Sequence, residues 1–388
     1  MDYFKESLEL HKKLSWKIEV ISKMNLETKE DLSLAYTPWV AEPCREIYKD
    51  KKKVYDYTIK SNTIAVISDG SAVLWLWNIW PEASLPVMEW KCMLLKKFAW
   101  VNAFPIVLGT QDTEEIIKTI KYISPGLGGI NLEDISAPRC FEIEDRLKEE
   151  LDIPVFHDDQ HWTAIVCLAW VINSLKITWK KKEDLRVVVN WVWAAWVAIT
   201  KLLLLYWVKD IVMVDTKWTI HKWRTDLNPV KEMLTNITNT ACLLDPTSTE
   251  CIIWWLDEAV KWRDLFIWVS APWVLTKEMV STMKEDAIIF AMANPVPEIM
   301  PEDAYEAWAK IVATWRSDYP NQLNNVLVFP WIFKGALDKK VSKITDEMKL
   351  NAATALASYV ENPTPYKIIP SVFDIWVASV IASSIREA

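Results

Sequence analysis

From Thr63 onward, short apolar runs rich in β-branched residues alternate with amphipathic segments. Four of these runs predict strands, at residues 63–68, 104–109, 127–135 and 153–156. Residues 112–123 have the apolar spacing of a helix, and Asp112 stands where its N-cap is expected. Strands that alternate with helices in this way are typical of parallel α/β domains.

The same alternation continues after His161, near the start of an apolar helical segment. Five further strands are predicted, at residues 185–190, 210–215, 265–269, 287–292 and 310–314. Four further helices are predicted, at residues 194–206, 228–238, 343–360 and 372–386. The pattern predicts an α/β chain with an N-terminal α/β domain over residues 1–160. A doubly wound, Rossmann-type nucleotide-binding domain with C-terminal helices is predicted over residues 161–388.

The composition disfavours several kinds of protein. The chain has 388 residues, of which 51% are hydrophobic, and this is enough for two domains with sizeable cores. Its net charge of −8 makes nucleic acid and anionic membranes poor partners. Residues 187–208 are apolar, but Asn190, Thr200 and Lys201 interrupt them, which favours a strand and a turn over a membrane span.

Neither the first residues nor the cysteines indicate an exported protein. The start MDYFKESLEL lacks the basic and apolar regions of a secretory signal. The six cysteines, at positions 44, 92, 140, 167, 242 and 251, are scattered and form no C-x-x-C pair. We therefore expect neither a zinc cluster nor a disulfide framework, and we expect a reducing, cytoplasmic setting.

Glycine is scarce in this chain and tryptophan is abundant. There are 6 glycines and 25 tryptophans, whereas about 27 glycines are expected in a chain of this length. Trp207 follows a helical run, Trp179 lies in a loop before a strand, and Trp39 and Trp273 each follow a proline. Glycine is preferred in such places because its backbone reaches left-handed conformations. We interpret the 25 tryptophans as replacements of glycine, which predicts left-handed backbone at these positions. A naturally tryptophan-rich protein would instead carry its indoles on apolar faces at helical or strand spacing.

Three of the tryptophans directly follow the predicted strand at 185–190. Trp191, Trp193 and Trp196 have the spacing of the G-x-G-x-x-G motif, whose glycines let the backbone approach a dinucleotide pyrophosphate. The residues expected to bind the cofactor at this turn are Asn190, Trp191, Trp193, Ala194, Ala195 and Trp196. The alternative is a structural turn without a ligand, and indoles within the turn would block the pocket.

Asp215 ends the next predicted strand, 19 residues after Trp196. An acidic residue at this place accepts hydrogen bonds from the adenosine ribose hydroxyls. Because a carboxylate repels a 2′-phosphate, the sequence predicts NAD as the cofactor, and NADP is less favoured.

Two acidic pairs follow short predicted strands. Glu133 and Asp134 lie in NLEDI. Asp158 and Asp159 lie in VFHDDQH. Because the carboxyl ends of parallel strands meet at one edge, we expect the carboxylates to converge, and Mg²⁺ or Mn²⁺ would neutralise them. The histidines of the second motif leave zinc open, but the sequence offers no third nitrogen or sulfur ligand. Helix capping or exposure to solvent is the alternative role of these acids.

Seven segments carry a further pattern. They are AYTPWVAEPC (35–44), SDGSAVLWLWNIWPEASLPVMEWK (68–91), NLEDI (131–135), VFHDDQHWTA (155–164), VVVNWVWAAWVAI (187–199), ANPVPE (293–298) and LNNVLVFPWIFKGALD (323–338). With each tryptophan interpreted as glycine, they resemble the malic enzyme family, specifically its short bacterial and archaeal branch. The resemblance covers nearly the whole chain and keeps the family's order. It implies a malic enzyme domain before the NAD-binding domain.

The resemblance also implies roles for individual residues. Tyr36 matches the family's general acid and Lys91 its general base, with Asp158 beside the lysine and the substrate. The implied metal ligands are Glu133, Asp134 and Asp159, and the implied neighbours of malate and nicotinamide are Asn294 and Asn325. The large eukaryotic branch has an arginine where this chain has Ala72, so the contact to the malate carboxylate must come from elsewhere.

The reaction that the resemblance implies is NAD-dependent and metal-dependent oxidative decarboxylation of L-malate to pyruvate and CO₂. It also implies a homodimer whose N-terminal segment lies near the partner subunit. A malolactic enzyme, which releases lactate, shares the fold and the motifs. A catalytically inactive assembly protein is the alternative if indoles fill the nucleotide turn. A metal-free amino-acid dehydrogenase of similar architecture would leave the NLEDI and HDD motifs unexplained.

Overall fold

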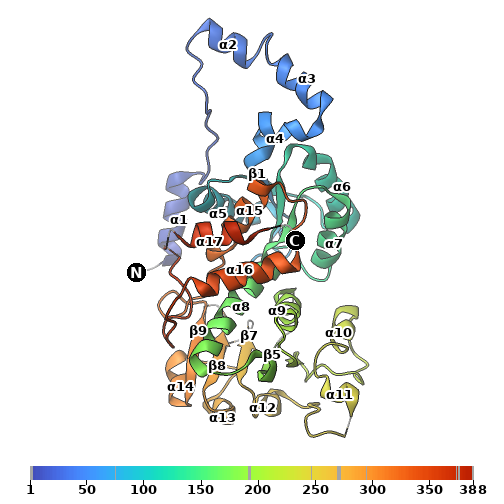
Figure 1. Cartoon of the computed structure of the whole chain (residues 1–388), viewed down its shortest axis with the longest axis vertical. Helices are drawn as coiled ribbons and strands as arrows, with labels where there is room; N and C mark the ends of the chain where they lie inside the picture. Colours follow the sequence, from blue (N-terminus) through green and yellow to red (C-terminus); the bar gives the residue numbers. More distant parts are fainter. Residues whose placement is uncertain are drawn as a thin grey trace. The chain divides into compact units, whose positions relative to one another are not determined.

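The chain folds into two units, each built on a parallel β-sheet (Figure 1). This computed structural model describes residues 3–74, 76–190, 194–245, 247–268, 272–293, 295–372, 374 and 376–386, except the side chains of Asp159 and Ala194. The first unit comprises residues 1–157 and 333–344, and the second comprises residues 158–332 and 345–388. The chain therefore leaves the first unit and later returns to it, a feature that no pattern in the sequence indicates.

The first unit contains a four-stranded sheet with the order β2-β1-β3-β4. Its parallel strands are β1 (Thr63–Ser68), β2 (Asn102–Val107), β3 (Gly129–Leu132) and β4 (Val155–His157). Every residue of β1 and β3 is buried, as expected for central strands of a parallel sheet covered on both faces. The strands predicted in this part of the sequence are confirmed, although their ends differ by up to three residues.

The helices of the first unit follow the local sequence closely. In α6 (Thr113–Ile123) the Asp112 side chain accepts a hydrogen bond from the Glu115 backbone N–H at 2.9 Å, which confirms the predicted N-cap. The other helices are α1 (Tyr3–Leu14), α2 (Lys29–Ala35), α3 (Ala41–Lys49), α4 (Val54–Tyr57), α5 (Pro81–Ala99) and α7 (Arg139–Glu150), with 3₁₀ turns η1 (Lys51–Lys53), η2 (Ile59–Asn62) and η3 (Ser124–Gly126).

The second unit contains a five-stranded parallel sheet with the order β6-β5-β7-β8-β9. Its strands are β5 (Arg186–Asn190), β6 (Asp210–Val214), β7 (Leu265–Trp268), β8 (Ala287–Ala291) and β9 (Ala309–Thr314). Counted from the first strand of the unit, this is the order 2-1-3-4-5 of a doubly wound nucleotide-binding fold. The predicted strands are confirmed to within one residue at each described end.

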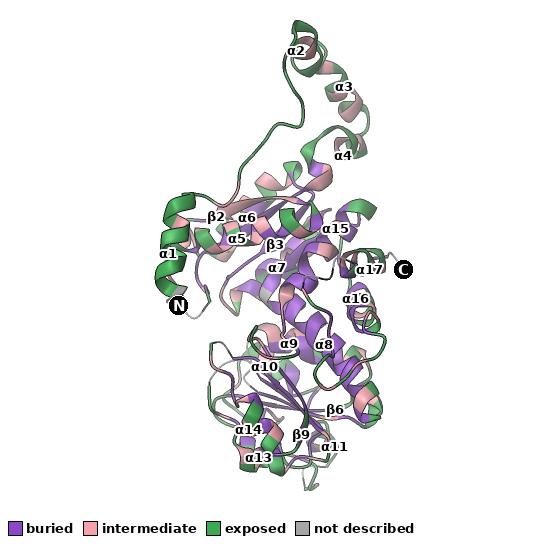
Figure 2. Cartoon of the chain, turned by 90° about the vertical axis from the view of Figure 1, so that its left-hand side faces the viewer, coloured by how far each residue is buried: buried purple, intermediate pink, exposed green. Residues whose placement is uncertain are grey.

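The long helix α8 (Asp158–Thr178) is buried along most of its length, and Figure 2 shows the strands of the second sheet buried as well. The remaining helices are α9 (Ala194–Leu205), α10 (Pro229–Leu234), α11 (Ala241–Leu244), α12 (Leu256–Ala259), α13 (Lys277–Ser281), α14 (Pro301–Glu306), α15 (Phe329–Lys339), α16 (Asp346–Ser358) and α17 (Val377–Ser384), with 3₁₀ turns η4 (Lys182–Asp184) and η5 (Asn325–Leu327). The predicted helix at 228–238 is shorter than expected, because it ends at Leu234. Among the described residues, no helix has the length and apolar character needed to cross a bilayer.

The N-terminal part of the first unit exposes many apolar side chains. Both views show α2 and α3 standing apart from the sheet and from α5 of the same unit (Figures 1 and 2). The exposed apolar residues of this arm, which we define as residues 29–49, include Leu32, Leu34, Tyr36, Trp39 and Val40. A surface of this kind is typical of a protein interaction site.

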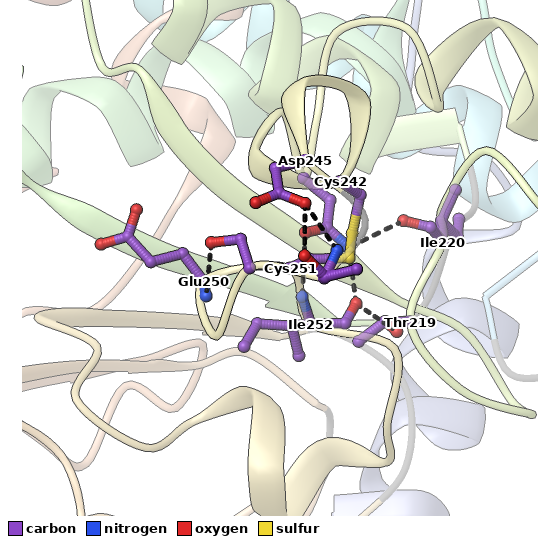
Figure 3. The surroundings of a disulfide bond; sticks show 10 residues. Thr219, Ile220, Cys242, Asp245, Glu250, Cys251 and Ile252 are labelled. Carbon is purple, nitrogen blue, oxygen red and sulfur yellow. Dashed lines mark hydrogen bonds between the residues drawn. A yellow bond between two sulfur atoms is a disulfide. The ribbon is translucent and has the colours of Figure 1, made fainter.

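The scattered cysteines predict no disulfide framework, but the structure contains a disulfide among its described residues. Cys242 and Cys251 are bonded, and they close a short loop that begins within α11 (Figure 3). The Ile252 carbonyl beside this loop accepts hydrogen bonds from Asn239 Nδ2 at 2.6 Å and from Thr219 Oγ1 at 2.9 Å. The spacing in the sequence gave no sign of the pair, because the two cysteines lie nine positions apart and no framework surrounds them.

The backbone supports part of the interpretation of the tryptophans. Eight described tryptophans have φ between 56° and 76°, at positions 77, 80, 100, 179, 207, 262, 273 and 308. Trp207 is the left-handed residue of a helix-ending motif, in which Val208 N–H donates to the Leu203 carbonyl at 3.0 Å. Trp39 does not have a positive φ, so the prediction of left-handed backbone fails there.

Among the described residues, four tryptophans are buried, and none of these four has a positive φ. They are Trp162, Trp170, Trp196 and Trp268. Trp170 packs its ring 4.8 Å from that of Phe290, and Trp162 lies 6.3 Å from the ring of Phe329. At these positions the backbone conformation does not require glycine, and the indoles fill core volume.

The left-handed backbone at Trp207 yields a stability prediction. Trp207 is exposed, so Trp207→Gly removes the strain of a side chain at positive φ and loses little packing. We expect the free energy of unfolding to rise by about 1 kcal/mol in urea unfolding. Trp90, in the interior of α5, is the control, and Trp90→Gly should lower it by about 0.5 kcal/mol. Equal effects of the two variants would contradict the glycine interpretation at position 207.

Candidate active site

The strand order of the first sheet reverses between β1 and β3, and ligands of open α/β sheets bind outside the carboxyl ends at such a point. The chain that follows β3 is tied to β1, because Glu133 N–H donates to the Ile67 carbonyl at 2.8 Å. The turn after β1 is tied in return, because Ala72 N–H donates to the Asp134 carbonyl at 3.0 Å. These bonds hold the two acidic residues of NLEDI at this edge of the sheet.

Lys91 and Glu133 meet at the carboxyl edge. Lys91 Nζ, from the middle of α5, lies 3.0 Å from Glu133 Oε1, and the two side chains are 14% and 3% exposed. Asn131 Nδ2 donates to the other carboxylate oxygen of Glu133 at 2.9 Å. A buried ion pair adds little to stability compared with apolar packing. Its presence at a strand end therefore makes this edge a candidate functional site.

Asp134 and Asp158 are also buried at strand ends, with 4% and 1% of their surfaces exposed. Asp134 has φ 53°, a conformation that costs energy in a residue other than glycine and is common at functional sites. Asp158 directly follows β4, and the pairing of Leu132 with His157 brings the ends of β3 and β4 level with each other. The backbone after both strands therefore leaves the sheet at the same edge.

The proposed metal ligands are partly placed by the structure. Glu133 and Asp134 provide buried carboxylate oxygens, which suit Mg²⁺ or Mn²⁺, whereas the side chain of Asp159 lies outside the description. Among the side chains that are described, no three or more His, Cys, Asp or Glu residues are grouped as a metal site. The donor chemistry fits the predicted ion, and the complete set of three ligands stays a prediction.

Tyr36 is not brought to this edge within its own chain. It caps the C-terminus of α2 and is 66% exposed. It belongs to the arm, which both views show apart from α5, the helix that carries Lys91 (Figures 1 and 2). The two residues that the resemblance pairs as acid and base are therefore separated in a single chain.

Sequence reasoning missed a second ion pair at the same edge. Asp69 follows β1 and is fully buried, and its Oδ2 lies 3.0 Å from Nη2 of Arg139 at the start of α7. The same guanidinium donates to Ser71 Oγ at 3.1 Å and to Ser136 Oγ at 3.0 Å. Arg139 thus joins the turn after β1, where Ser71 precedes Ala72, to the turn after β3. In the sequence, the polar segment SDGS was the only indication of this ion pair.

The second unit also has a switch point, between β5 and β7. Asn190 ends β5 and is buried, and its Oδ1 has no hydrogen-bond partner among the described residues. Trp191 and Trp193 lie outside the described residues, and α9 begins at Ala194, followed by Ala195 and the buried Trp196. An unused acceptor at the end of the first strand fits a ligand at this edge.

Asp215 directly follows β6 and is buried among cations. Its Oδ1 accepts from Arg224 Nη1 at 2.9 Å, and its Oδ2 accepts from Lys231 Nζ at 2.6 Å. Burial raises the pKa of Asp215, but the hydrogen bonds from Arg224, Lys231 and the Lys217 backbone outweigh burial and leave the pKa below its usual value. Asp215, the acid that the sequence predicts to bind the adenosine ribose, is therefore ionised and already hydrogen-bonded to these groups.

The predicted substrate neighbours are less fully placed. Asn294 lies outside the described residues. Asn325 begins the 3₁₀ turn η5, and its Oδ1 is buried with no hydrogen-bond partner among the described residues. Its role stays a prediction.

Comparisons with known proteins agree with this architecture. The family model described as "Malic enzyme, N-terminal domain" matches residues 15–148, and the model described as "Malic enzyme, NAD binding domain" matches residues 161–387. The chain therefore belongs to the malic enzyme family, whose members are oxidoreductases.

Two curated relatives and one solved structure show how close the similarity is. The chain is 51% identical to a bifunctional malic/malolactic enzyme of Bacillus subtilis, over 100% of this chain and 93% of the relative. It is 53% identical to an NAD-dependent malic enzyme of Geobacillus stearothermophilus, over 96% of this chain and 76% of the relative. The crystal structure of an NAD-dependent malic enzyme from Thermotoga maritima has a TM-score of 0.92 at 47% identity, over 97% of this chain and 98% of that one.

The Asp69–Arg139 pair yields a second prediction. Arg139→Met leaves the fully buried Asp69 carboxylate without its cation, so the free energy of unfolding should fall by about 3 kcal/mol in urea unfolding. Arg146→Met is the matched control, because Arg146 pairs with the exposed Glu114 on the surface and should cost about 1 kcal/mol or less. A loss no larger for Arg139 than for Arg146 would show that Asp69 does not depend on this arginine.

Proposed function

We propose that the protein catalyses NAD-dependent and divalent-metal-dependent oxidative decarboxylation of L-malate to pyruvate and CO₂. The observation that carries the proposal is the buried Lys91–Glu133 pair beside Asp134 at the β1–β3 switch point. Membership in the malic enzyme family and similarity to an NAD-dependent malic enzyme support the same reaction.

The proposed proton chemistry is balanced between two side chains. Lys91, as the neutral amine, takes the proton of the malate C2 hydroxyl, and Tyr36 gives a proton to C3 after CO₂ has left. One proton is taken and one is returned, so malate and NAD⁺ yield pyruvate, CO₂ and NADH without net proton release. Glu133 holds the amine of Lys91 in place through their 3.0 Å contact, and Asp158 is proposed to lie beside the lysine and the substrate.

Glu133, Asp134 and Asp159 would hold the metal, and the segment from Asn190 to Trp196, with Asp215, would hold NAD. When bound, the metal supplies stabilisation of negative charge at the C2 oxygen, and NAD supplies the acceptor for the C2 hydride. Asn294 and Asn325 are proposed to orient malate against the nicotinamide. The cofactor turn needs bare backbone at 191 and 193, and if indoles fill it, a catalytically inactive assembly protein becomes the better description.

A malolactic enzyme is the second candidate, and the similarity to the bifunctional malic/malolactic enzyme favours keeping it. Both reactions begin with the same proton and hydride removal from C2 of malate. They differ in whether the product leaves as pyruvate or is reduced to lactate.

We further propose a homodimer in which Tyr36 of each subunit serves the Lys91 of the other. The arm carrying Tyr36 exposes Leu32, Leu34 and Val40 and stands apart from α5. A second copy of the chain would cover these apolar side chains, and in a two-fold dimer each arm would make the same contact. The arrangement would supply each site with the acid that its own chain does not place beside Lys91.

Product analysis tests the proposed reaction. With L-malate, NAD⁺ and Mn²⁺, we expect NADH and pyruvate to form in equal amounts, and chelation of the metal should stop the reaction. Lactate without NADH would establish the malolactic alternative instead. The double variant Trp191→Gly/Trp193→Gly is the control for the turn. Activity in that variant alone would assign the loss to the indoles, and inactivity of both chains would contradict the proposed function.

Mixing two inactive variants tests the exchange of Tyr36. Tyr36→Phe and Lys91→Ala should each abolish turnover, and each should still bind NAD. When equal amounts are dissociated and reassembled together, random dimers should regain about one quarter of the wild-type activity, because half are mixed and each has one intact site. If Tyr36 served its own chain, every site would lack one group, and the mixture would stay inactive.

A further inference from the structure

Asp134 has a backbone conformation that a residue other than glycine adopts only at a cost. Its φ is 53°, in the left-handed region, and the residue is buried. The backbone conformation sets the direction in which the Cβ atom leaves the chain. The position of the Asp134 carboxylate therefore depends on contacts that keep the segment after β3 in this conformation.

Two hydrogen bonds from the turn after β1 hold this segment. The Ala72 N–H donates to the Asp134 carbonyl at 3.0 Å. Two residues further along, the Ser136 N–H donates to Ser71 Oγ at 2.9 Å. The conformation at Asp134 is therefore tied to the place of Ser71 and Ala72.

The turn after β1 is itself held by a buried ion pair. Asp69 Oδ1 accepts from the Ser71 N–H at 3.0 Å and from Ser71 Oγ at 2.5 Å, and Asp69 Oδ2 lies 3.0 Å from Arg139 Nη2. The same nitrogen donates to Ser71 Oγ at 3.1 Å and to Ser136 Oγ at 3.0 Å. The Ser71 hydroxyl thus uses its one donor and both of its acceptor positions. We call Asp69, Ser71, Ser136 and Arg139 the Ser71 clamp.

Stability alone does not account for the Ser71 clamp. A buried carboxylate and guanidinium gain little over apolar side chains of similar size. The clamp does fix one arrangement of neighbouring turns, because Arg139 also donates through Nη1 to the carbonyl of Gln111, which follows β2. The turns after β1, β2 and β3 are therefore held together around the backbone that carries Glu133 and Asp134.

We propose that the Ser71 clamp is a positioning device for the divalent metal, which holds Asp134 in the left-handed conformation from which its carboxylate binds the ion. The proposal rests on the proposed function, which makes Asp134 a metal ligand. The clamp residues do not themselves contact the ion in this proposal, and the charges of Asp69 and Arg139 offset each other. Losing a group that supports a ligand from behind weakens metal binding by about 10- to 100-fold.

Mn²⁺ titration followed by electron paramagnetic resonance tests the proposal on the full chain without malate, NAD or turnover. The signal of free Mn²⁺ reports how much of the ion is bound. Ser71→Ala should weaken Mn²⁺ binding by about tenfold or more, because the Ser136 N–H loses its partner while the Asp69–Arg139 pair remains. Arg139→Lys should weaken it as well, because lysine keeps the charge opposite Asp69 but lacks the fork that reaches both serines.

Ser84→Ala is the matched control. Ser84 is a buried serine of the same unit, and its hydroxyl donates to the Pro81 carbonyl at 2.6 Å within α5. The variant loses one buried hydroxyl, as Ser71→Ala does, and should keep the wild-type affinity for Mn²⁺. Urea unfolding shows which variants are folded, and Ser71→Ala carries the test if Arg139→Lys is not.

Asp134→Asn separates failure of this proposal from failure of the proposed function, because it should greatly weaken Mn²⁺ binding. If it does, then unchanged affinity in Ser71→Ala or in folded Arg139→Lys would overturn the proposal alone. An equal loss in Ser71→Ala and Ser84→Ala would do the same. If the wild-type chain binds no Mn²⁺, or if Asp134→Asn binds it as tightly as the wild type, the metal assignment and this proposal are both wrong.

Discussion

A carboxylate buried at the end of an apolar strand needs a cation beside it, because the cost of removing an unpaired charge from water exceeds what a strand end contributes to stability. Both sheets meet this constraint in the same way. Asp69 is held by Arg139 after β1, Glu133 by Lys91 after β3, and Asp215 by Arg224 after β6. Arg139 and Lys91 come from helices distant in sequence, so these two pairs also tie separate segments together, whereas Arg224 lies nine positions after Asp215.

This constraint explains why chemistry collects at the carboxyl edges. The strand interiors are apolar and covered on both faces, so they tolerate no charge. At the strand ends the backbone turns away and the carboxylates find partners from neighbouring turns. In the first unit, Glu133 meets Lys91 at the point where strand order reverses, and the second unit places Asn190 at the corresponding point. One topological rule thus places polar side chains at corresponding points of the two sheets.

The hydrophobic pattern predicted the sheets well because burial on both faces leaves a strong signal in each strand. The acidic pairs were also predictable, since Glu133 and Asp134 directly follow a strand. Contacts between distant segments were not. Arg139 shows no pattern that points to Asp69, the Cys242–Cys251 bond depends on a loop held by Asn239 and Thr219, and the exposure of Tyr36 depends on where its helix packs. The backbone conformation at the tryptophans was predictable only in part. Trp207 has the left-handed conformation that a helix end favours in glycine, whereas Trp170 packs in the core without a positive φ.

The return of residues 333–344 to the first unit has a consequence for how the protein is made on the ribosome. Phe333 packs against Phe156 with ring centroids 6.4 Å apart, Leu337 closely approaches Gly128 beside β3, and Lys340 reaches Asp56 at 3.1 Å. These contacts cannot form until nearly the whole polypeptide has been synthesised. The N-terminal sheet must therefore wait, with part of its apolar surface uncovered, while the entire second sheet emerges from the exit tunnel. Translation speed and chaperone access over that interval become determinants of yield, and a gene fragment ending near residue 160 would encode an N-terminal unit that lacks one of its own pieces.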